Sequence, residues 1–366
     1  MSSPDSALGQ RLAARTLELV DIPSPSRDEA RIAESVAALV PQGRLTLSVE
    51  QEETLLYLPR ARREERPLVV LAGHFDTVPA QGNIPGRLEE DAVWGLGASD
   101  MKSGLAVMVE LARTLAQERD EPAVDLGLLF FAREELPASE SPLPALFARM
   151  PDLGGAGLVV MMEPTDNTIQ AGCLGNLDAT LVFTGESAHS ARPWLGVNAI
   201  ERAIAGLRPI VAIEPRPVEI GGLTFVEVVS LTGIEGGLAG NVIPDRVSCR
   251  LNFRYAPDRS PADAEAQLER LAAEAHADAI ELIGNSPPAR VVTDAPLVTR
   301  LREAGGFALE PKQAWTPVAD FTSRGLDAVN LGPGATRYAH RRDEQVAVPE
   351  LVRTFRALER FLGASV

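Results

Sequence analysis

Three apolar stretches, each ending in polar residues that can bind a metal ion, constrain the fold of this chain more than any other feature. They are PLVVLAGHFDT (67–77), VDLGLLFFAREEL (124–136) and AGLVVMMEPTD (156–166). Because their apolar residues continue without alternation, they predict strands that are covered on both faces, as in a parallel or mixed sheet. A fourth stretch, DAVNLGPG (327–334), has the same character.

Segments with helical periodicity separate these strands, at residues 6–20, 28–40, 101–117 and 349–362. Strands that alternate with helices indicate the α/β class, here with a mixed sheet between helices. A chain of 366 residues is longer than one compact core usually accommodates, so we expect two domains.

The middle of the chain has a different order of elements. From about Asp178 the pattern reads strand, helix, strand, strand, helix, strand, which is the ferredoxin-like order of an α+β domain. The run Asn285-Ser286-Pro287-Pro288 is typical of a linker. We therefore predict a discontinuous α/β domain, residues 1–177 and 289–366, with a lid domain of residues 178–288 inserted into it.

Composition excludes two classes of partner. A formal net charge of -16 argues against nucleic acid, because phosphate binding requires clustered Lys and Arg. No apolar run approaches the roughly 20 residues that span a bilayer, which argues against membrane insertion. The amino-terminal residues lack the basic and apolar regions of a secretory signal, so we expect a cytoplasmic protein whose two cysteines are reduced.

The predicted strand ends concentrate residues that bind divalent cations. In an open α/β sheet, ligands collect at the carboxyl ends of the strands. Imidazole and carboxylate groups are ligands of zinc, and the absence of cysteine from the set favours a catalytic site over a structural one. The residues at these ends, together with one before a predicted helix and one after the last strand, are His74, Asp76, Asp100, Glu134, Glu135, Glu163 and His340.

Two local spacings suggest distinct roles. If His74 binds a metal through one ring nitrogen, Asp76 two residues later can hold the other nitrogen. The adjacent Glu134 and Glu135 would repel each other if both were buried and ionised, unless a cation offset their charge. One of them can bind that cation while the other accepts a proton from the attacking water.

Each of these residues also has a simpler interpretation. An Asp or Glu at a strand end is often a helix cap or a solvated charge, Asp100 can be the N-cap of the helix that follows, and an isolated His74 can be a core histidine. Independent caps are not expected to fall at the ends of successive apolar strands, however, and this joint pattern favours the metal site.

The motifs at or near the predicted strand ends are GHFDTVP (73–79), GASDMKSG (97–104), REE (133–135), EPTDN (163–167) and AHRRDE (339–344). From about residue 70 onward, these motifs resemble the M20 metallopeptidase and deacylase family. The inserted segments SAHSARPWLGVNAI (187–200), GGLAGNVIPD (236–245) and LNFRYAPDRS (251–260) are similar to the actinobacterial-type branch that acts on succinyl-diaminopimelate.

The resemblance implies two Zn²⁺ ions, for which Co²⁺ or Mn²⁺ can substitute, bridged by Asp100. It implies His74 and Glu163 as the other ligands of one ion, and Glu135 and His340 as those of the second. The peptide bond after Asp100 is expected to be cis, as in related enzymes.

The resemblance also implies the residues that act beside the metals. Glu134 would be the general base, and Asp76 would orient His74. The family further implies a homodimer formed through the lid domains, in which His189 of one subunit stabilises the oxyanion in the other subunit's site. Without the resemblance, His189 has the simpler interpretation of a capping or surface residue.

Arg254 and Asn241 match family positions that contact the carboxylate ends of the substrate, and Thr316 is a further candidate for the same pocket. Arg254 suits a carboxylate because its planar fork binds both oxygens. A salt bridge within the lid is the simpler interpretation of Arg254. Two loops depart from the proteobacterial desuccinylases: residues 172–176 lack their arginine, and residues 316–319 lack their Thr-Ser-Asp-Gly run.

The expected activity is hydrolysis of N-succinyl-LL-2,6-diaminopimelate to succinate and LL-2,6-diaminopimelate, a step of lysine and cell-wall precursor synthesis. The two departing loops leave an N-acetyl-amino-acid deacetylase or an aminoacyl carboxypeptidase as alternatives. A member that binds a small molecule without catalysis is a third interpretation, which the retention of Glu134 and all five ligand positions disfavours.

Overall fold

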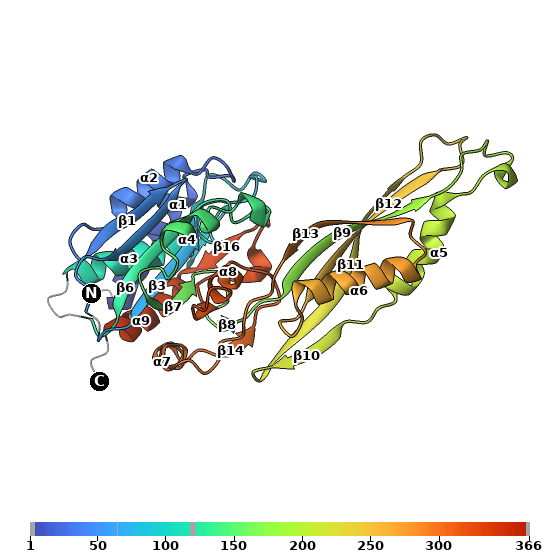
Figure 1. Cartoon of the computed structure of the whole chain (residues 1–366). Coiled ribbons are helices and arrows are strands. Elements are labelled where there is room, and N and C mark those ends of the chain that lie inside the picture. Colours follow the sequence, from blue (N-terminus) through green and yellow to red (C-terminus); the bar gives the residue numbers. More distant parts are fainter. Residues whose placement is uncertain (1–3, 64, 118–121, 364–366) are drawn as a thin grey trace. The chain divides into compact units, whose positions relative to one another are not determined.

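The computed structural model describes residues 4–63, 65–117 and 122–363, and it divides into two compact units (Figure 1). The remaining residues of the predicted α/β domain, 1–3, 64, 118–121 and 364–366, lie outside the described residues. Unit 1 comprises Met1–Ala171, Val292–Glu310 and Asp320–Val366, and unit 2 comprises Gly172–Val291 and Pro311–Ala319. The sequence prediction had placed residues 172–177, 289–291 and 311–319 of unit 2 in the α/β domain.

Within the described residues, unit 1 is built on an eight-stranded mixed sheet. Its strands, in spatial order, are β1 (Leu45–Gln51), β2 (Thr54–Pro59), β6 (Asp125–Phe131), β3 (Leu68–His74), β7 (Ala156–Met161), β15 (Ala328–Asn330), β8 (Ile169–Ala171) and β14 (Leu309–Pro311). The central strands β6, β3, β7 and β15 are parallel, whereas β1, β2 and β8 pair antiparallel with their neighbours.

The central strands are apolar without alternation because neither face meets water. Every residue of β3 and of β6 is buried. Helix α3 packs on these two strands, α1 and α9 pack on α3, and α2 packs on β2. The described helices of this part of the chain are α1 (Pro4–Val20), α2 (Ala30–Leu39), α3 (Lys102–Gln117), α4 (Leu143–Arg149), α7 (Pro296–Gly305), α8 (Val318–Thr322) and α9 (Val348–Gly363). The predicted α/β class is thereby confirmed.

A small second sheet of unit 1 contains β4 (Arg87–Glu89), β5 (Ala92–Trp94) and β16 (Gln345–Ala347), in the order β16-β5-β4. Its short strands come from distant parts of the chain, and sequence periodicity did not predict them. The sheet is relevant to the site because β16 directly follows the segment that contains His340.

Unit 2 has one antiparallel sheet with two helices packed on one of its faces. Its elements are β9 (Gly175–Thr184), α5 (Ala199–Val211), β10 (Arg216–Ile220), β11 (Leu223–Gly236), β12 (Arg246–Tyr255), α6 (Pro261–Glu274) and β13 (Ala279–Ser286), and the strand order is β10-β11-β12-β9-β13. Apart from β10, this is the predicted ferredoxin-like succession of elements. β10 carries Pro217, which an edge strand tolerates, and this residue hid it from the sequence pattern.

Local sequence explains where the two helices of unit 2 begin. The side chain of Asn198 accepts a hydrogen bond from the Ile200 amide at 2.9 Å and caps α5. Ser260 and Asp263 form a capping box around the start of α6, with Pro261 in its first turn. Both helices bury their apolar faces against alternate residues of β9 and β12.

Candidate metal centre

The parallel strands β3, β6 and β7 end at one edge of the sheet of unit 1. β3 pairs with β6 up to His74 opposite Phe131, and with β7 up to Ala72 opposite Met161. The chain beyond each strand therefore emerges at this edge, which is where α/β sheets bind ligands.

The first group of candidate ligands is His74, Asp100 and Glu163. One possible ligand atom from each lies within 4.8 Å of the others. The Nε2 atom of His74 is 3.3 Å from Oδ1 of Asp100 and 3.7 Å from Oε1 of Glu163. The imidazole is buried and both carboxylates are nearly so, as expected of ligands that hold a cation against a protein core.

The second group is Asp100, Glu135 and His340. The Nε2 atom of His340 is 2.9 Å from Oε1 of Glu135 and 3.5 Å from Oδ2 of Asp100. Asp100 thus takes part in both groups and turns a different oxygen toward each histidine. The structure brings all five sequence-predicted ligands together in an arrangement that suits two neighbouring cations.

Asp76 contacts His74, a member of the first group. The Nδ1 atom of His74 is 3.0 Å from the carbonyl oxygen of Asp76 and 3.4 Å from its carboxylate oxygen Oδ1, which leaves Nε2 directed at the ligands. The same carboxylate accepts hydrogen bonds from the amides of Glu134 at 2.9 Å and Glu135 at 3.0 Å. Sequence spacing predicted the contact with His74 but not this second role.

The turn that carries Glu134 and Glu135 has a further support. Arg133 adopts a left-handed backbone with φ 61°, so the chain changes direction immediately after β6. The buried carboxylate of Glu29 accepts a hydrogen bond from the Arg133 amide at 3.2 Å, and the hydroxyl of Ser26 donates to Asp76 at 2.8 Å. Neither residue was predicted, because neither belongs to an apolar strand or a ligand motif.

Asp100 precedes helix α3 in a loop with two notable features. The Asp100–Met101 peptide bond is cis, as the family resemblance implied. The buried carboxylate of Glu344 accepts hydrogen bonds from the amides of Ser99 at 3.0 Å and Asp100 at 2.9 Å. Glu344 stands in the motif with His340, but sequence reasoning gave it no role.

Electrostatics at this edge favour a bound cation. Burial, together with Glu163, Glu135 and Asp100, raises the pKa of Glu134 well above its usual value, and His74 only partly opposes this. Hydrogen bonds to Asp100 and Glu135 raise the pKa of His340 to about 10. Negative charge is therefore in excess, and two divalent ions held by the two ligand groups would neutralise it, so the residues fit the cofactor.

The other predicted site residues belong to unit 2. His189 is exposed, and its Nδ1 accepts a hydrogen bond from the Ala191 amide at 3.0 Å, so the neutral ring carries its proton on Nε2. The Ser190 amide donates to the carbonyl of Asn241 at 2.9 Å, which holds the segments of His189 and Asn241 side by side.

Arg254 and Thr316 also lie in unit 2. Arg254 is partly buried on β12, and its Nε donates to Asn252 at 2.9 Å. Lys312 is buried as well, and in the described part of the chain neither cation forms an ion pair. The buried hydroxyl of Thr316 likewise has no hydrogen-bond partner among the described residues. Arg254 thus forms no ion pair in the described residues, although the charge of Asp178 partly opposes the lowering of its pKa by burial.

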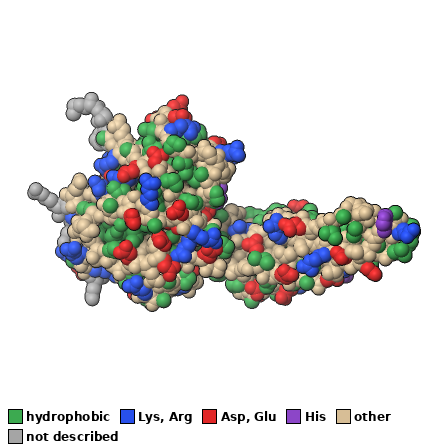
Figure 2. All heavy atoms as spheres, turned by 90° about the horizontal axis from the view of Figure 1, so that it is seen from above, with side chains coloured by type: hydrophobic (Ala, Val, Ile, Leu, Met, Phe, Trp, Pro, Cys, Tyr) green, Lys and Arg blue, Asp and Glu red, His purple; other side chains and the backbone are tan. Residues whose placement is uncertain are grey.

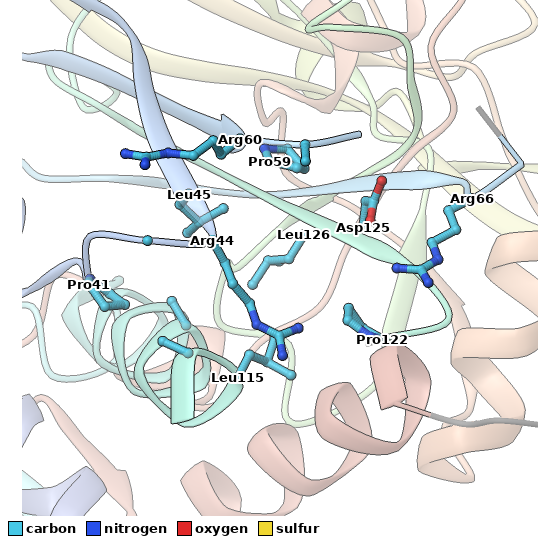
Figure 3. A pocket seen from close by; sticks show the side chains of 14 residues that line it. Pro41, Arg44, Leu45, Pro59, Arg60, Arg66, Leu115, Pro122, Asp125 and Leu126 are labelled. Atoms are coloured by element: carbon cyan, nitrogen blue, oxygen red, sulfur yellow. The ribbon is translucent and has the colours of Figure 1, made fainter. Parts of the chain in front are cut away.

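Unit 1 also has a cavity of about 390 Å³ that is separate from the two groups of candidate metal ligands (Figure 3). Arg44, Arg60 and Arg66 line it together with Asp125, the first residue of β6. Of the candidate ligands, Glu135 follows the opposite end of that strand, after Phe131, and the residues that line the cavity include none of the predicted site residues.

Comparison with known proteins gives the family. The model of peptidase family M20/M25/M40 matches residues 70–364. The chain belongs to the M20 family. Among its M20 relatives, the putative succinyl-diaminopimelate desuccinylase of Mycobacterium tuberculosis is 42% identical over 95% of this chain and 97% of its own. The succinyl-diaminopimelate desuccinylase of Corynebacterium glutamicum is 36% identical, over 95% of each chain.

Solved structures of M20 proteins share the fold. The aminopeptidase PepT of Bacillus cereus has a TM-score of 0.78 and 19% identity, covering 97% of this chain and 98% of its own. The M20 metallo-carboxypeptidase of Sulfolobus solfataricus has a TM-score of 0.73 and 18% identity, covering 98% of both chains. Family and site together identify the chain as a metal-dependent amidohydrolase that uses a divalent cation.

Two further observations concern partners. None of the helices in residues 4–63, 65–117 and 122–363 combines the length and apolar character that crossing a bilayer requires. On the face shown in Figure 2, acidic and basic side chains of the described residues are interspersed rather than gathered into a basic surface.

Proposed function

We propose that this chain is a two-zinc amidohydrolase that converts N-succinyl-LL-2,6-diaminopimelate to succinate and LL-2,6-diaminopimelate. The observation that carries the chemistry is the sharing of Asp100 between two ligand groups, with Glu134 on the same turn as Glu135. The substrate is supported by the names of relatives that are 42% and 36% identical over nearly the whole chain. Co²⁺ or Mn²⁺ can substitute for zinc in this proposal.

His74, Asp100 and Glu163 would hold one ion, and Asp100, Glu135 and His340 the other. When bound, the ions supply Lewis acidity that polarises the amide carbonyl and acidifies water. The chain itself supplies the proton transfer. Glu134 takes a proton from the attacking water and later delivers it to the departing amine. Burial raises the pKa of the Glu134 carboxyl, which favours its uptake of a proton.

His189 would stabilise the oxyanion in the site of a second copy of the chain. Its Nε2 proton is available for donation because Nδ1 already accepts from the Ala191 amide. Helix α5 leaves Ile204 and Val211 66% exposed, an apolar face that suits a homodimer formed through unit 2. Light scattering should show a dimer that Ile204→Glu dissociates, and a monomeric wild-type protein would contradict this arrangement.

The polar groups of unit 2 suit a substrate with acidic ends. Arg254 and Lys312 are cations without ion-pair partners in the described residues, and Thr316 offers a buried hydroxyl. With Asn241, Arg254 and Thr316 would bind the carboxylates of the substrate. Both cysteines, Cys173 and Cys249, are free and buried, which agrees with the cytoplasmic location that we propose.

The test is a comparison of kcat/KM for the zinc-loaded enzyme on N-succinyl-LL-diaminopimelate and on N-acetylornithine. We expect a preference of about a thousandfold or more for the succinyl compound, roughly 4 kcal/mol of transition-state discrimination. Turnover of N-acetylornithine alone would replace the proposal with an N-acetyl-amino-acid deacetylase. Hydrolysis of dipeptides alone would indicate an aminoacyl carboxypeptidase.

The variant Arg254→Lys tests whether Arg254 is responsible for the preference for the succinyl substrate. Arg254→Lys keeps the positive charge but loses the planar fork that binds both carboxylate oxygens. We expect it to lower kcat/KM on the succinyl substrate more than on the acetyl substrate. Equal losses on both compounds would mean that Arg254 does not contact the acidic acyl end.

A further inference from the structure

Glu344 is a buried carboxylate that faces the backbone of the loop carrying Asp100. It is 1% exposed, and its Oε1 atom accepts hydrogen bonds from the amides of Ser99 at 3.0 Å and Asp100 at 2.9 Å. We propose that Glu344 is a positioning residue, which fixes the backbone of Asp100 so that this one side chain can serve both ligand groups. The inference rests on the two-metal centre of the proposed function.

Other hydrogen bonds hold the Asp100 loop and the segment of Glu344 in place. The hydroxyl of Ser99 donates to the carbonyl of Ala335 at 3.0 Å, and the Gly95 amide donates to the carbonyl of Glu344 at 3.0 Å. The amide of Glu344 in turn donates to the carbonyl of Arg341 at 3.3 Å. The segment 340–344 therefore carries a ligand of the second group, His340, and also holds the backbone of the ligand shared by both groups.

The position of Asp100 matters more than that of any other ligand. Its Oδ1 atom is 3.3 Å from Nε2 of His74, while its Oδ2 atom is 3.5 Å from Nε2 of His340. A change in its backbone would therefore disturb both groups at once. Residues that orient a ligand in this way commonly change metal affinity by one or two orders of magnitude when they are removed.

The surroundings of Glu344 separate it from a carboxylate that only stabilises the fold. Glu110 is also buried in unit 1, at 2% exposure, but it forms ion pairs with Arg11 at 3.0 Å and Arg15 at 2.9 Å. Within the described residues Glu344 forms no ion pair, and the hydrogen bonds to its carboxylate come from backbone amides of the ligand loop. A buried carboxylate committed to that loop is best explained by the placement of Asp100.

Asp76 gives an independent parallel in the same site. Its carboxylate accepts from two consecutive amides, those of Glu134 and Glu135, just as Glu344 accepts from Ser99 and Asp100. Asp76 and Glu344 are thus both buried carboxylates at this edge, and each accepts hydrogen bonds from one of the loops that present ligands.

The experiment compares Glu344→Ala with Glu344→Gln. The hydrogen bonds from the Ser99 and Asp100 amides are both accepted by Oε1, so glutamine can keep these two while alanine cannot. Zinc affinity is measured by chelator competition without substrate, and amide exchange of residues 96–101 is followed in the metal-free protein by mass spectrometry. We expect Glu344→Ala to weaken zinc binding about 10- to 100-fold and to speed exchange in this peptide. Glu344→Gln should stay within about threefold of wild type in both measurements.

Glu110→Ala is the matched control. It removes an equally buried glutamate, so it should lower thermal stability while leaving zinc affinity and exchange of residues 96–101 unchanged. An unchanged zinc affinity in folded Glu344→Ala would overturn the proposal. So would an equal loss in Glu344→Gln, because the charge rather than the hydrogen bonds would then be responsible.

The outcomes also separate this inference from the proposed substrate. A wild-type protein that binds zinc but leaves the succinyl substrate intact would refute the desuccinylase proposal, and the Glu344 comparison would stand. A wild-type protein that binds no zinc would overturn the metal centre and the role of Glu344 together.

Discussion

The carboxylates Glu227 and Glu134, each in a cluster of charged side chains, differ in what balances their negative charge. In unit 2, Glu227 is 5% exposed and receives hydrogen bonds from Arg216 at 2.6 Å and Arg259 at 2.7 Å. Burial alone would raise the pKa of Glu227, but these guanidinium groups and the Ala256 amide outweigh it and lower the pKa. In unit 1, burial and neighbouring carboxylates raise the pKa of Glu134 well above its usual value.

The difference shows what each cluster is for. Around Glu227 the chain provides its own cations, so the cluster is complete and serves the fold. Around Glu134, the two ligand groups combine two histidines with three carboxylates, and hydrogen bonds to Asp100 and Glu135 raise the pKa of His340 to about 10. Such an excess of negative charge is costly unless a cation from outside binds, which marks the edge as functional.

The comparison predicts opposite results for the same substitution in the two clusters, and Glu134→Gln should give the largest effect. Removing the general base should lower kcat about a thousandfold, or roughly 4 kcal/mol in the activation barrier. Because a source of like-charge repulsion is also removed, the metal-free variant should be no less stable than wild type. Steady-state kinetics with urea unfolding would check both, and a variant with normal kcat would favour a different base or a non-catalytic member.

Metal removal should have the second-largest effect, and it should lower the stability of unit 1 more than that of unit 2. At a free zinc concentration of about 1,000 times the dissociation constant, binding stabilises the folded state by about 4 kcal/mol. We expect this gain in unit 1, since His74 and Asp100 belong to it, and little change in unit 2. Hydrogen exchange in urea with and without a chelator can be read separately in β3 and β6 and in β9 and β12. Equal protection of both pairs of strands by zinc would contradict the expectation that the metal stabilises unit 1 alone.

Much of this architecture was predictable because the residues concerned follow simple periods. The unbroken apolar runs around residues 67–77 and 124–136 predicted buried strands, and β3 and β6 are buried throughout. The succession of strand and helix segments from about Asp178 likewise predicted the elements of unit 2 apart from β10. The candidate ligands could be named because they follow these strands directly, and the family motifs then assigned their roles.

The remaining features depend on contacts between distant parts of the chain, which leave no local pattern. Glu29 reaches Arg133 across 104 residues, and Glu344 reaches Asp100 across 244. Strand β10 was concealed by Pro217, and the assignment of Pro311–Ala319 to unit 2 depends on tertiary packing. A supporting residue is recognised by what it touches, and this became visible only in the folded chain.

Glu227→Gln should give the smallest of the three effects, and it sharpens the comparison because its cost falls on stability alone. Its partners Arg216 and Arg259 are 46% and 25% exposed, so solvent screens the pairs, and we expect a loss of about 1–2 kcal/mol. Since folding lowers the pKa of Glu227, its contribution is complete above the unfolded-state pKa of about 4.3 and disappears as pH falls through the lowered folded-state pKa.

The difference in stability between wild type and Glu227→Gln should therefore be largest near neutral pH and shrink below about pH 4. Urea unfolding can be followed in a Trp94→Phe background, where the remaining tryptophans, Trp194 and Trp315, both report on unit 2. With Glu134 intact, kcat should be unchanged under conditions where the variant is folded. A difference in stability that grew as the pH fell would mean that Glu227 is not stabilised as an anion. The arginines around Glu227 could then no longer be contrasted, as a source of balancing charge, with the metal ions proposed near Glu134.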